Sequence, residues 1–514
     1  MQTELNGKPN LDSSAAESDR DHPCGRLIMV SNRGPLEHYI DDTGRLQRRW
    51  NSGGVATALS ALTTSTPLTW IANASSDADR KLAERGRIVE LEHGKCLRLV
   101  APEVDASDLF YNTFCNPILW FVHHSLCGLL QREDAEQQAL DAWEHGYLPV
   151  NQAFAEAVVE ELERSERPGH VMLHDYHFYA APLFIRNLSP TTVLQHFIHV
   201  PWPEPEGWRQ LPRPIVESIC EGLLANDSVV FQTEQSVSNF IRTCEAFLPD
   251  AEIAADGDSI THAGRTTRVW ANPVSVDIWD LRGQLMSPEA ETYRASLSAA
   301  KGQRTIVRVD RLDPSKNIVA GFRAFDRLLE QHPEWAGAVR FLAFLVPSRT
   351  GIPEYRTYAE EVFAEVEAVN ERHAGPGWTP ITVFHEENRL QALVALSLYD
   401  VLLVNPVVDG MNLVSKEGPV LNERDGVLVL SKSAGSYAEL GEAALAVCSD
   451  DIDGTAEALH AALGLPADER RQRAQSLRAA VLRHDLRRWL SLLLADLGGA
   501  ESTLPTVAEA TGPR

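Results

Sequence analysis

Short apolar runs alternate with longer amphipathic segments along most of the chain. Such alternation predicts an α/β fold in which parallel strands are joined by crossover helices. Strands buried on both faces should be apolar nearly throughout, as residues 339–346 and 400–405 are. The predicted strands are 26–32 (RLIMVSN), 191–200 (TTVLQHFIHV), 228–233 (SVVFQT), 305–310 (TIVRVD), 339–346 (VRFLAFLV), 400–405 (DVLLVN) and 426–431 (GVLVLS).

The stretch 248–272 is rich in Gly, Asp and Thr and predicts an irregular connection, which places a domain boundary near residue 275. The second domain then starts its own sheet with a short strand at Ile306–Val309. We therefore expect two Rossmann-like domains flanked by polar ends. The predicted divisions are a disordered tail over 1–25, domains over 26–273 and 274–474, a C-terminal helix over 475–497 that packs back on the first domain, and a disordered tail over 498–514.

Composition excludes several classes of partner. The 514 residues include 47 Lys and Arg against 72 Asp and Glu, a formal charge of −25, which disfavours nucleic acid and anionic membranes. We see no stretch of 18 apolar residues and no signal peptide, so we expect a cytoplasmic protein. Seven Cys without regular spacing favour reduced, mostly buried thiols. The sequence leaves open whether the protein forms a homo-oligomer.

Polar residues that directly follow strands are the main candidates for chemistry, because ligands of open parallel sheets bind beyond the carboxyl ends of the strands. After 305–310 come Arg311 and Lys316, in a loop where Pro314 prevents an early helix. An Arg fork and a Lys point charge suit a diphosphate leaving group. A solvated basic turn is the alternative.

A second candidate loop follows the strand 400–405. Asp409 and Gly410 indicate a turn, and the residues from Met411 onward indicate a helix that carries Glu417. Free N–H groups at the start of a helix can hold a phosphate or a sugar hydroxyl, with Asp409 facing the sugar and Glu417 the ribose. Alternatively, Asp409 caps the helix.

Histidines end two further strands. His199 follows an apolar strand and precedes a proline-fixed loop, and most such histidines have a structural role. The strand 171–173 delivers His174, Asp175 and His177 to one edge, with Asp175 as a carboxylate aimed into a cleft. The His174/His177 spacing resembles half a metal site but is weak evidence for one.

An earlier pair of loops also suits an anion. Arg33 follows the first strand, and Gly53 and Gly54 stand at the expected start of a helix, where bare backbone amides can meet a phosphate. Each half of the chain thus offers cations and glycines at strand ends. We therefore expect a cleft between two domains that closes on an anionic ligand.

Several motifs, in order, resemble the trehalose-6-phosphate synthase family of retaining GT-B glycosyltransferases (family 20), over about residues 26–495. They are SNRGP, SGGVATAL, FYNTFCNPILWFVHH, LHDYHFYAAP, FIHVPWPEPEGWRQLP, RVDRLDPSKN, VPSR, DGMNLVSKE and LSKSAGS. The resemblance implies a GT-B fold with parallel sheets facing across a cleft, an acceptor-binding first domain and a nucleotide-sugar-binding second domain. It implies synthesis of α,α-trehalose 6-phosphate from GDP- or UDP-glucose and glucose 6-phosphate, without cofactor or metal.

By the same resemblance, individual positions take roles. The donor would be bound by Gly53, Gly54, Arg311, Lys316, Asp409, Gly410, Met411, Asn412, Leu413, Val414 and Glu417. The phosphorylated acceptor and its reacting hydroxyl would be held by Arg33, Tyr111, Trp120, Asp175 and Arg349. Catalysis would fall to His199, by its backbone or side chain, with Asp409, Arg311 and Lys316.

Other activities stay open at this point. Pro314, Asn317 and NPVSVD depart from the common bacterial pattern, and PVLNERDGVLVLS resembles the validamycin pseudo-glycosyltransferase. The acceptor could therefore be a cyclitol phosphate or glycerol 3-phosphate. A glycosidase using Asp409 and Glu417 would leave Arg311 and Lys316 without a role. A silent sugar-phosphate-binding regulator would be expected to lose those donor-loop cations.

Overall fold

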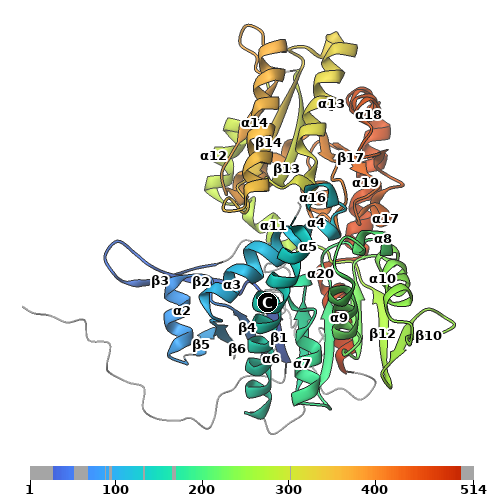
Figure 1. The fold of residues 1–514 in the computed structure, drawn as a ribbon. Coiled ribbons are helices and arrows are strands. Elements are labelled where there is room, and N and C mark those ends of the chain that lie inside the picture. Colours follow the sequence, from blue (N-terminus) through green and yellow to red (C-terminus); the bar gives the residue numbers. More distant parts are fainter. Residues whose placement is uncertain are drawn as a thin grey trace, which may run out of the picture.

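The computed structural model describes residues 27–50, 68–86, 88–91, 95–130, 134–164, 169–300 and 302–498. Two lobes, one from each half of the chain, are each built around a sheet of mainly parallel strands (Figure 1). Gly53, Gly54, the tail predicted over 1–25 and all but the first residue of the tail predicted over 498–514 lie outside the described residues. Each of the seven strands predicted from the hydrophobic pattern is present.

The N-terminal lobe contains a ten-stranded sheet whose seven central neighbours, from β12 to β6, run parallel. Its central strands β1, β8 and β7 are almost wholly buried, as their apolar sequences predict. In spatial order the strands are β10 (Glu252–Ile253), β11 (Ser259–His262), β12 (Arg265–Ala271), β9 (Ser228–Phe231), β8 (Val193–Phe197), β7 (His170–His174), β1 (Leu27–Ser31), β4 (Leu68–Asn73), β6 (Lys95–Val100) and β5 (Ile88–Leu91).

The prediction of an irregular connection over 248–272 is wrong. This segment forms β10, β11 and β12, and β12 pairs with β9. Ala263 and Gly264 both have positive φ, which gives the two-residue hairpin turn that matches strand twist. In β12 the buried β-branched residues Thr267 and Val269 alternate with the exposed residues Thr266 and Arg268, and this was the overlooked signal.

Helices and one separate hairpin complete the N-terminal lobe. The hairpin β2 (Leu36–Ile40) and β3 (Leu46–Trp50) extends away from the lobe (Figure 1). A helical segment at Leu109–Leu119 continues into α4 (Trp120–His123) and delivers Trp120. The other helices are α2 (Asp77–Glu84), α3 (Val104–Asp108), α5 (Ala135–Ala142), α6 (Leu148–Glu163), α7 (Ala181–Leu188), α8 (Pro205–Trp208), α9 (Arg213–Leu223) and α10 (Glu234–Phe247).

The C-terminal lobe contains a six-stranded, all-parallel sheet in the order β15 (Ile381–Phe384), β14 (Val339–Val346), β13 (Arg304–Arg311), β16 (Val401–Val404), β17 (Val427–Ser431) and β18 (Leu445–Val447). Its helices are α11 (Ile278–Gln284), α12 (Pro288–Leu297), α13 (Ile318–Gln331), α14 (Pro353–His373), α15 (Arg389–Leu398), α16 (Val414–Leu421), α17 (Tyr437–Leu440), α18 (Ile452–Gly464) and α19 (Ala467–Arg483). Loops after β13 and β16 carry the donor-side candidates.

The segment predicted as one helix over 475–497 is two helices, α19 and α20 (Leu486–Gly498), which break at His484. α19 packs on α16 of the C-terminal lobe, whereas α20 returns to the N-terminal lobe (Figure 1). There Gln195 Nε2 donates to the Leu493 carbonyl at 3.1 Å, and Asn272 Nδ2 donates to that of Trp489 at 3.0 Å. The end of the chain thus ties the lobes together.

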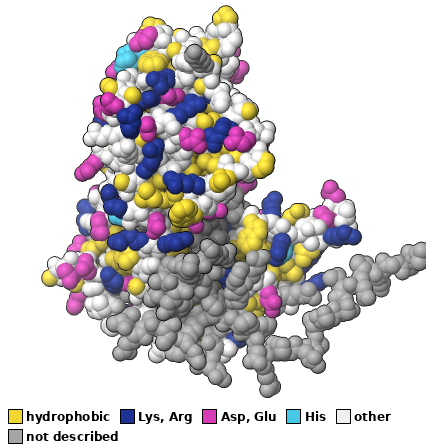
Figure 2. Space-filling view, turned by 180° about the vertical axis from the view of Figure 1, so that it is seen from behind, with side chains coloured by type: hydrophobic (Ala, Val, Ile, Leu, Met, Phe, Trp, Pro, Cys, Tyr) yellow, Lys and Arg dark blue, Asp and Glu magenta, His cyan; other side chains and the backbone are white. Residues whose placement is uncertain are grey.

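The surface and the thiols refine the compositional picture. On the face drawn in Figure 2, basic and acidic side chains are interspersed over the upper lobe. None of the described helices is long and apolar enough to cross a membrane.

Cys115, Cys127, Cys220, Cys244 and Cys448 are free, but Cys96 is disulfide-bonded. The expectation of reduced thiols is therefore wrong for Cys96, because spacing along the chain does not report which cysteines meet in space.

Candidate active site

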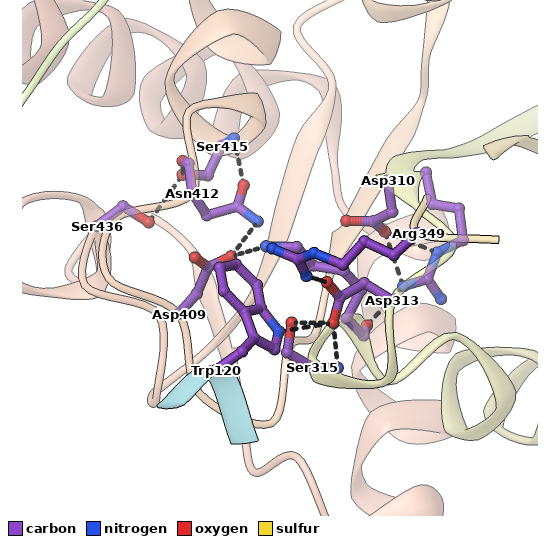
Figure 3. Close-up of polar contacts among 11 residues, drawn as sticks. Trp120, Asp310, Asp313, Ser315, Arg349, Asp409, Asn412, Ser415 and Ser436 are labelled. Atoms are coloured by element: carbon purple, nitrogen blue, oxygen red, sulfur yellow. Dashed lines mark hydrogen bonds and ion pairs between the residues drawn. The ribbon is translucent and has the colours of Figure 1, made fainter. Parts of the chain in front are cut away.

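Lys316 and Asp409 form an ion pair beyond the ends of β13 and β16. Asn412 Nδ2 donates to the same Asp409 oxygen at 3.1 Å (Figure 3). Burial alone would raise the pKa of Asp409, but the Lys316 charge and the hydrogen bonds hold it below its ordinary value. Asp409 is therefore an anion already neutralised by the donor-side cation.

The LSKSAGS motif holds the Asp409 loop in place through its backbone. The Asp409 N–H donates to the Ser433 carbonyl at 3.1 Å, and the Gly435 N–H donates to the Asp409 carbonyl at 2.9 Å. The Ser436 N–H donates to the Met411 carbonyl at 2.9 Å. The two sequence motifs, 409–417 and 430–436, thus form one rigid loop pair.

The prediction that a helix begins at Met411 is wrong, because α16 begins at Val414. Asn412 adopts a φ of 73°, and its Oδ1 accepts the Ser415 N–H at 3.1 Å. Asn412, rather than Asp409, therefore satisfies the free amide at the start of this helix. Asp409 is left for the ion pair with Lys316.

Gly410 marks the closest approach of the two lobes in this region. A Cβ on Gly410 would lie 2.0 Å from the carbonyl oxygen of His199 and 3.1 Å from the carbonyl carbon of Val200. The glycine is thus required for space between two protein segments, and its φ is not positive. Met411 and Leu413 pack into the apolar cluster that includes Val274.

His199 is half-buried, and its imidazole lies between two side chains. Its Nε2 is 3.3 Å from His174 Nδ1, and its Nδ1 is 3.4 Å from Gln232 Nε2. Burial lowers the pKa of His199 to about 3, so the ring is neutral at physiological pH. The His199 N–H donates to Asp175 Oδ1 at 3.3 Å.

Asp175 follows β7 with a φ of 72°, in the left-handed region that non-glycine residues seldom adopt. Burial raises the pKa of Asp175 to about 6, although backbone N–H donors, including that of His199, and the charge of Arg311 oppose this rise. Arg311, at the end of β13, is exposed, and its guanidinium lies 5.3 Å from the ring centre of Trp120. A cation of the C-terminal lobe thus faces a carboxylate and an indole of the N-terminal lobe.

Arg349 is the second cation over Trp120, with its guanidinium 4.0 Å from the ring centre. Its Nη1 pairs with Asp313 Oδ2 at 3.0 Å (Figure 3). Its Nη2 donates to the Tyr176 hydroxyl at 3.3 Å. Arg349 has a φ of 47° and is buried. It is therefore fixed in place before any anion arrives.

Asp313 organises this part of the site. Its Oδ1 accepts the Trp120 indole N–H at 3.2 Å, and it also accepts the Ser315 N–H at 3.0 Å. Burial would raise the pKa of Asp313, but Arg349 and Arg311 lower it to about 2. The predicted diphosphate loop is thus tied to the predicted acceptor side by one carboxylate.

Tyr111 and Arg33 lie around His177. The Tyr111 ring stacks on that of His177, with centroids 6.3 Å apart and planes 10° apart. Burial, and then the charges of Arg349 and Arg33, lower the pKa of His177 to about 3. Arg33 itself is exposed. The charges of Arg33 and Arg349 thus act on the same region of the N-terminal lobe.

Glu417 is buried on α16, and its Oε1 pairs with Arg389 Nη2 at 3.1 Å. Arg389 was not predicted from the sequence, because it begins α15 and follows no motif. Asp313 and Tyr176 were not predicted either, although both lie inside motifs of the family. The Asp-Pro-Ser sequence at 313–315, typical of a cap before a turn, was an available signal for Asp313.

His174 and His177 do not share a metal position, since His174 faces His199 and His177 stacks on Tyr111. Across the described ranges, the one cluster close enough to share an ion is His332, Glu334 and His460, at the opposite end of α13 from Lys316.

The match to a family model decides the assignment of this chain. The model for glycosyltransferase family 20 matches residues 25–498. The chain belongs to glycosyltransferase family 20. Family membership confirms the resemblance drawn from the motifs and identifies the chain as a glycosyltransferase.

Individual relatives agree with this family. A bifunctional trehalose-6-phosphate synthase/phosphatase of Thermoproteus tenax is 33% identical over 94% of this chain, which spans 65% of that longer protein. An α,α-trehalose-phosphate synthase (UDP-forming) of Schizosaccharomyces pombe is 30% identical over 92% of this chain and 90% of its own length. These relatives match the chain across both lobes.

A solved structure confirms the fold. The α,α-trehalose-phosphate synthase (UDP-forming) of Burkholderia xenovorans, in complex with glucose-6-phosphate, superimposes with a TM-score of 0.78 at 28% identity. The superposition covers 92% of this chain and all of that one. The predicted α/β fold of GT-B type, with two parallel-sheet domains, is therefore confirmed.

Proposed function

We propose that this glycosyltransferase is a retaining enzyme that forms α,α-trehalose 6-phosphate from a nucleoside diphosphate glucose and glucose 6-phosphate. One observation supports the proposal most directly: two cations of the C-terminal lobe lie over one aromatic ring of the N-terminal lobe. The guanidinium groups of Arg311 and Arg349 lie 5.3 and 4.0 Å from the ring centre of Trp120. Such a pair suits two anions brought together, a departing diphosphate and an acceptor phosphate.

On the donor side, Arg311 and Lys316 would neutralise the diphosphate. Asp409, with the backbone of Gly410, Met411, Asn412, Leu413 and Val414, would contact the sugar, and Glu417 would accept hydrogen bonds from the ribose. Gly53 and Gly54 take their role, closing over the donor, from the family resemblance. The ion pair of Glu417 with Arg389 supports the ribose-binding role of Glu417, because it orients the carboxylate.

On the acceptor side, Arg33, Tyr111, Trp120 and Arg349 would hold the sugar phosphate, and Asp175 would accept a hydrogen bond from the reacting hydroxyl. The charges of Arg349 and Arg33 both lower the pKa of His177, which supports this arrangement. Two cations near one position suit a phosphate dianion. Residues 26–273 would thus supply the acceptor site and residues 274–474 the donor site.

The reaction would proceed on one face of the sugar. The leaving diphosphate oxygen accepts the proton of the acceptor hydroxyl, while Arg311 and Lys316 stabilise the negative charge that develops on it. A glycosidase mechanism needs one carboxylic acid with a raised pKa. The pKa of Asp409 is lowered, so Asp409 does not meet that need, and the Glu417 carboxylate is occupied by its ion pair with Arg389.

A product assay tests the proposal. Purified protein is incubated with UDP-, GDP- or ADP-glucose, each with glucose 6-phosphate, glycerol 3-phosphate or an aminocyclitol phosphate. Because two relatives are named as UDP-forming enzymes, UDP-glucose is the first donor to test, with GDP-glucose beside it. We expect mass and NMR to show a disaccharide phosphate whose single glycosidic linkage joins two α-anomeric carbons. A product from only another acceptor, or none, would refute the proposal.

We further propose that the enzyme is cytoplasmic and works without metal, cofactor, nucleic acid or membrane. Its site is built from fixed cations, which supply the charge neutralisation that a divalent ion supplies in other transferases. Turnover should therefore be unchanged after treatment with EDTA. A loss of turnover that added Mg²⁺ restores would contradict this part of the proposal.

A further inference from the structure

Val274 lies in the linker between the lobes and is held by a buried side chain from each of them. Its N–H donates to Gln232 Oε1 at 2.9 Å, and its carbonyl accepts a hydrogen bond from Lys416 Nζ at 2.8 Å. Gln232 directly follows β9 of the N-terminal lobe, and Lys416 lies on α16 of the C-terminal lobe. Gln232 and Lys416 are 2% and 0% exposed, so these contacts are shielded from water.

The bond to Val274 fixes which way the Gln232 amide faces. A backbone N–H can only donate, so the atom beside it must be the Gln232 carbonyl oxygen. The NH₂ group then faces His199 Nδ1, at 3.4 Å. Because an amide NH₂ can only donate, His199 Nδ1 must accept and carries no proton.

The same logic extends to the next ring. A neutral His199 without a proton on Nδ1 carries it on Nε2, which faces His174 Nδ1 at 3.3 Å. His174 then accepts at Nδ1 and carries its own proton on Nε2. Burial lowers the pKa of both histidines, which keeps the two rings neutral. Both ring nitrogens of His199 are therefore occupied by protein partners.

We propose that Gln232 is a positioning residue for His199, which it holds in the tautomer protonated on Nε2. The function of this arrangement rests on the proposed transferase reaction. Since the imidazole is engaged on both sides, the part of His199 that reaches the donor loop is its backbone carbonyl, packed against Gly410. Because Gln232 bonds to both His199 and Val274, it fixes the His199 carbonyl relative to Val274, the linker residue that both lobes hold.

The first test measures the tautomer directly. In protein labelled with ¹⁵N-histidine, long-range ¹H–¹⁵N correlation spectra distinguish the two neutral tautomers, and the His199→Gln and His174→Gln variants assign the signals. We expect both rings to be protonated on Nε2. A wild-type His199 protonated on Nδ1, or charged at pH 7, would overturn the proposal. This measurement needs no substrate, so it stands even if the proposed transferase activity fails.

The second test uses matched variants. Gln232→Met removes the bonds to Val274 and His199, whereas Gln195→Met removes the bonds of another buried glutamine to α20, at 3.1 and 2.7 Å. We expect Gln232→Met to shift the His199 ¹⁵N signals and to lower kcat on the order of tenfold, with both KM values changed less than about threefold. The Gln195→Met control should lose comparable thermal stability but leave the His199 signals and kcat unchanged. Equal effects of the two variants on kcat and on the signals would overturn the proposal.

Discussion

Replacing Gly410 with alanine tests the contact between the lobes at the candidate site. The added methyl group would meet the His199 carbonyl oxygen at 2.0 Å, whereas ordinary van der Waals contacts of a Cβ begin near 3.4 Å. Two backbone segments would thus have to separate by roughly 1.4 Å, the difference between these distances. Neither is the end of a flexible side chain, so the separation moves the Asp409 loop or the His199 strand end.

A displacement of this size should act mainly on turnover. Misplacing reacting groups by about 1 Å costs on the order of 100-fold in rate, or about 2.7 kcal/mol. Overpacking should also lower the free energy of unfolding by about 1–3 kcal/mol. Because φ at Gly410 is not positive, an alanine adds no backbone strain of the left-handed kind, and the effect reports the steric contact alone.

The assay compares Gly410→Ala with Gly283→Ala, in which the same change falls in α11 with nothing within 4 Å of the new methyl group. Product formation from the active donor and acceptor pair gives kcat/KM, and thermal denaturation gives stability. The Gly283 variant should keep wild-type kcat/KM and gain up to about 1 kcal/mol in stability. A folded Gly410→Ala enzyme with kcat/KM within threefold of wild type would refute the reasoning.

Three further predictions concern charged residues. Arg311→Ala should raise the activation barrier by about 2–4 kcal/mol, measured as the loss of kcat/KM, and near-normal turnover would contradict its role on the diphosphate. Arg349→Ala should mainly raise the KM for the phosphorylated acceptor; an effect confined to the donor KM would refute that role. It should also destabilise the fold by roughly 3–5 kcal/mol in denaturant titrations, because Asp313 loses its buried partner. Since the pKa of Asp175 is raised to about 6 and we expect its carboxylate form to be active, kcat/KM should fall as the pH drops through 6, and Asp175→Asn should remove this limb.

Much of the fold could be predicted from the sequence because its strands are buried on both faces. Strands such as β14 and β16 are apolar nearly throughout and are bounded by turns, so their pattern has one interpretation. The hairpin β11 and β12 was missed because its strands lie near the edge, where polar and apolar residues mix. The break at His484 was missed because both flanking segments have helical periodicity.

Charged site residues could be predicted because they follow strands inside motifs, but their partners could not. Pairing of Glu417 with Arg389 joins two helices, and nothing local to either helix predicts it. The left-handed backbone of Asp175, Arg349 and Asn412 was equally hidden, since such strain is held by tertiary contacts. For Gly410, the sequence predicted a turn but not that this turn packs against the His199 carbonyl.

The carboxylates of the site explain how a protein with a charge of −25 can hold two anionic substrates. Lys316 is paired with Asp409 and Arg349 with Asp313, so both cations are oriented and partly neutralised before binding. Arg311 is exposed and, within the part of the chain that the structure describes, makes no ion pair. An incoming diphosphate would therefore meet Arg311 first and then compete with Asp409 for Lys316. This competition would move Lys316 away from Asp409 and free the carboxylate to accept sugar hydroxyls, which links charge neutralisation to the orientation of the sugar.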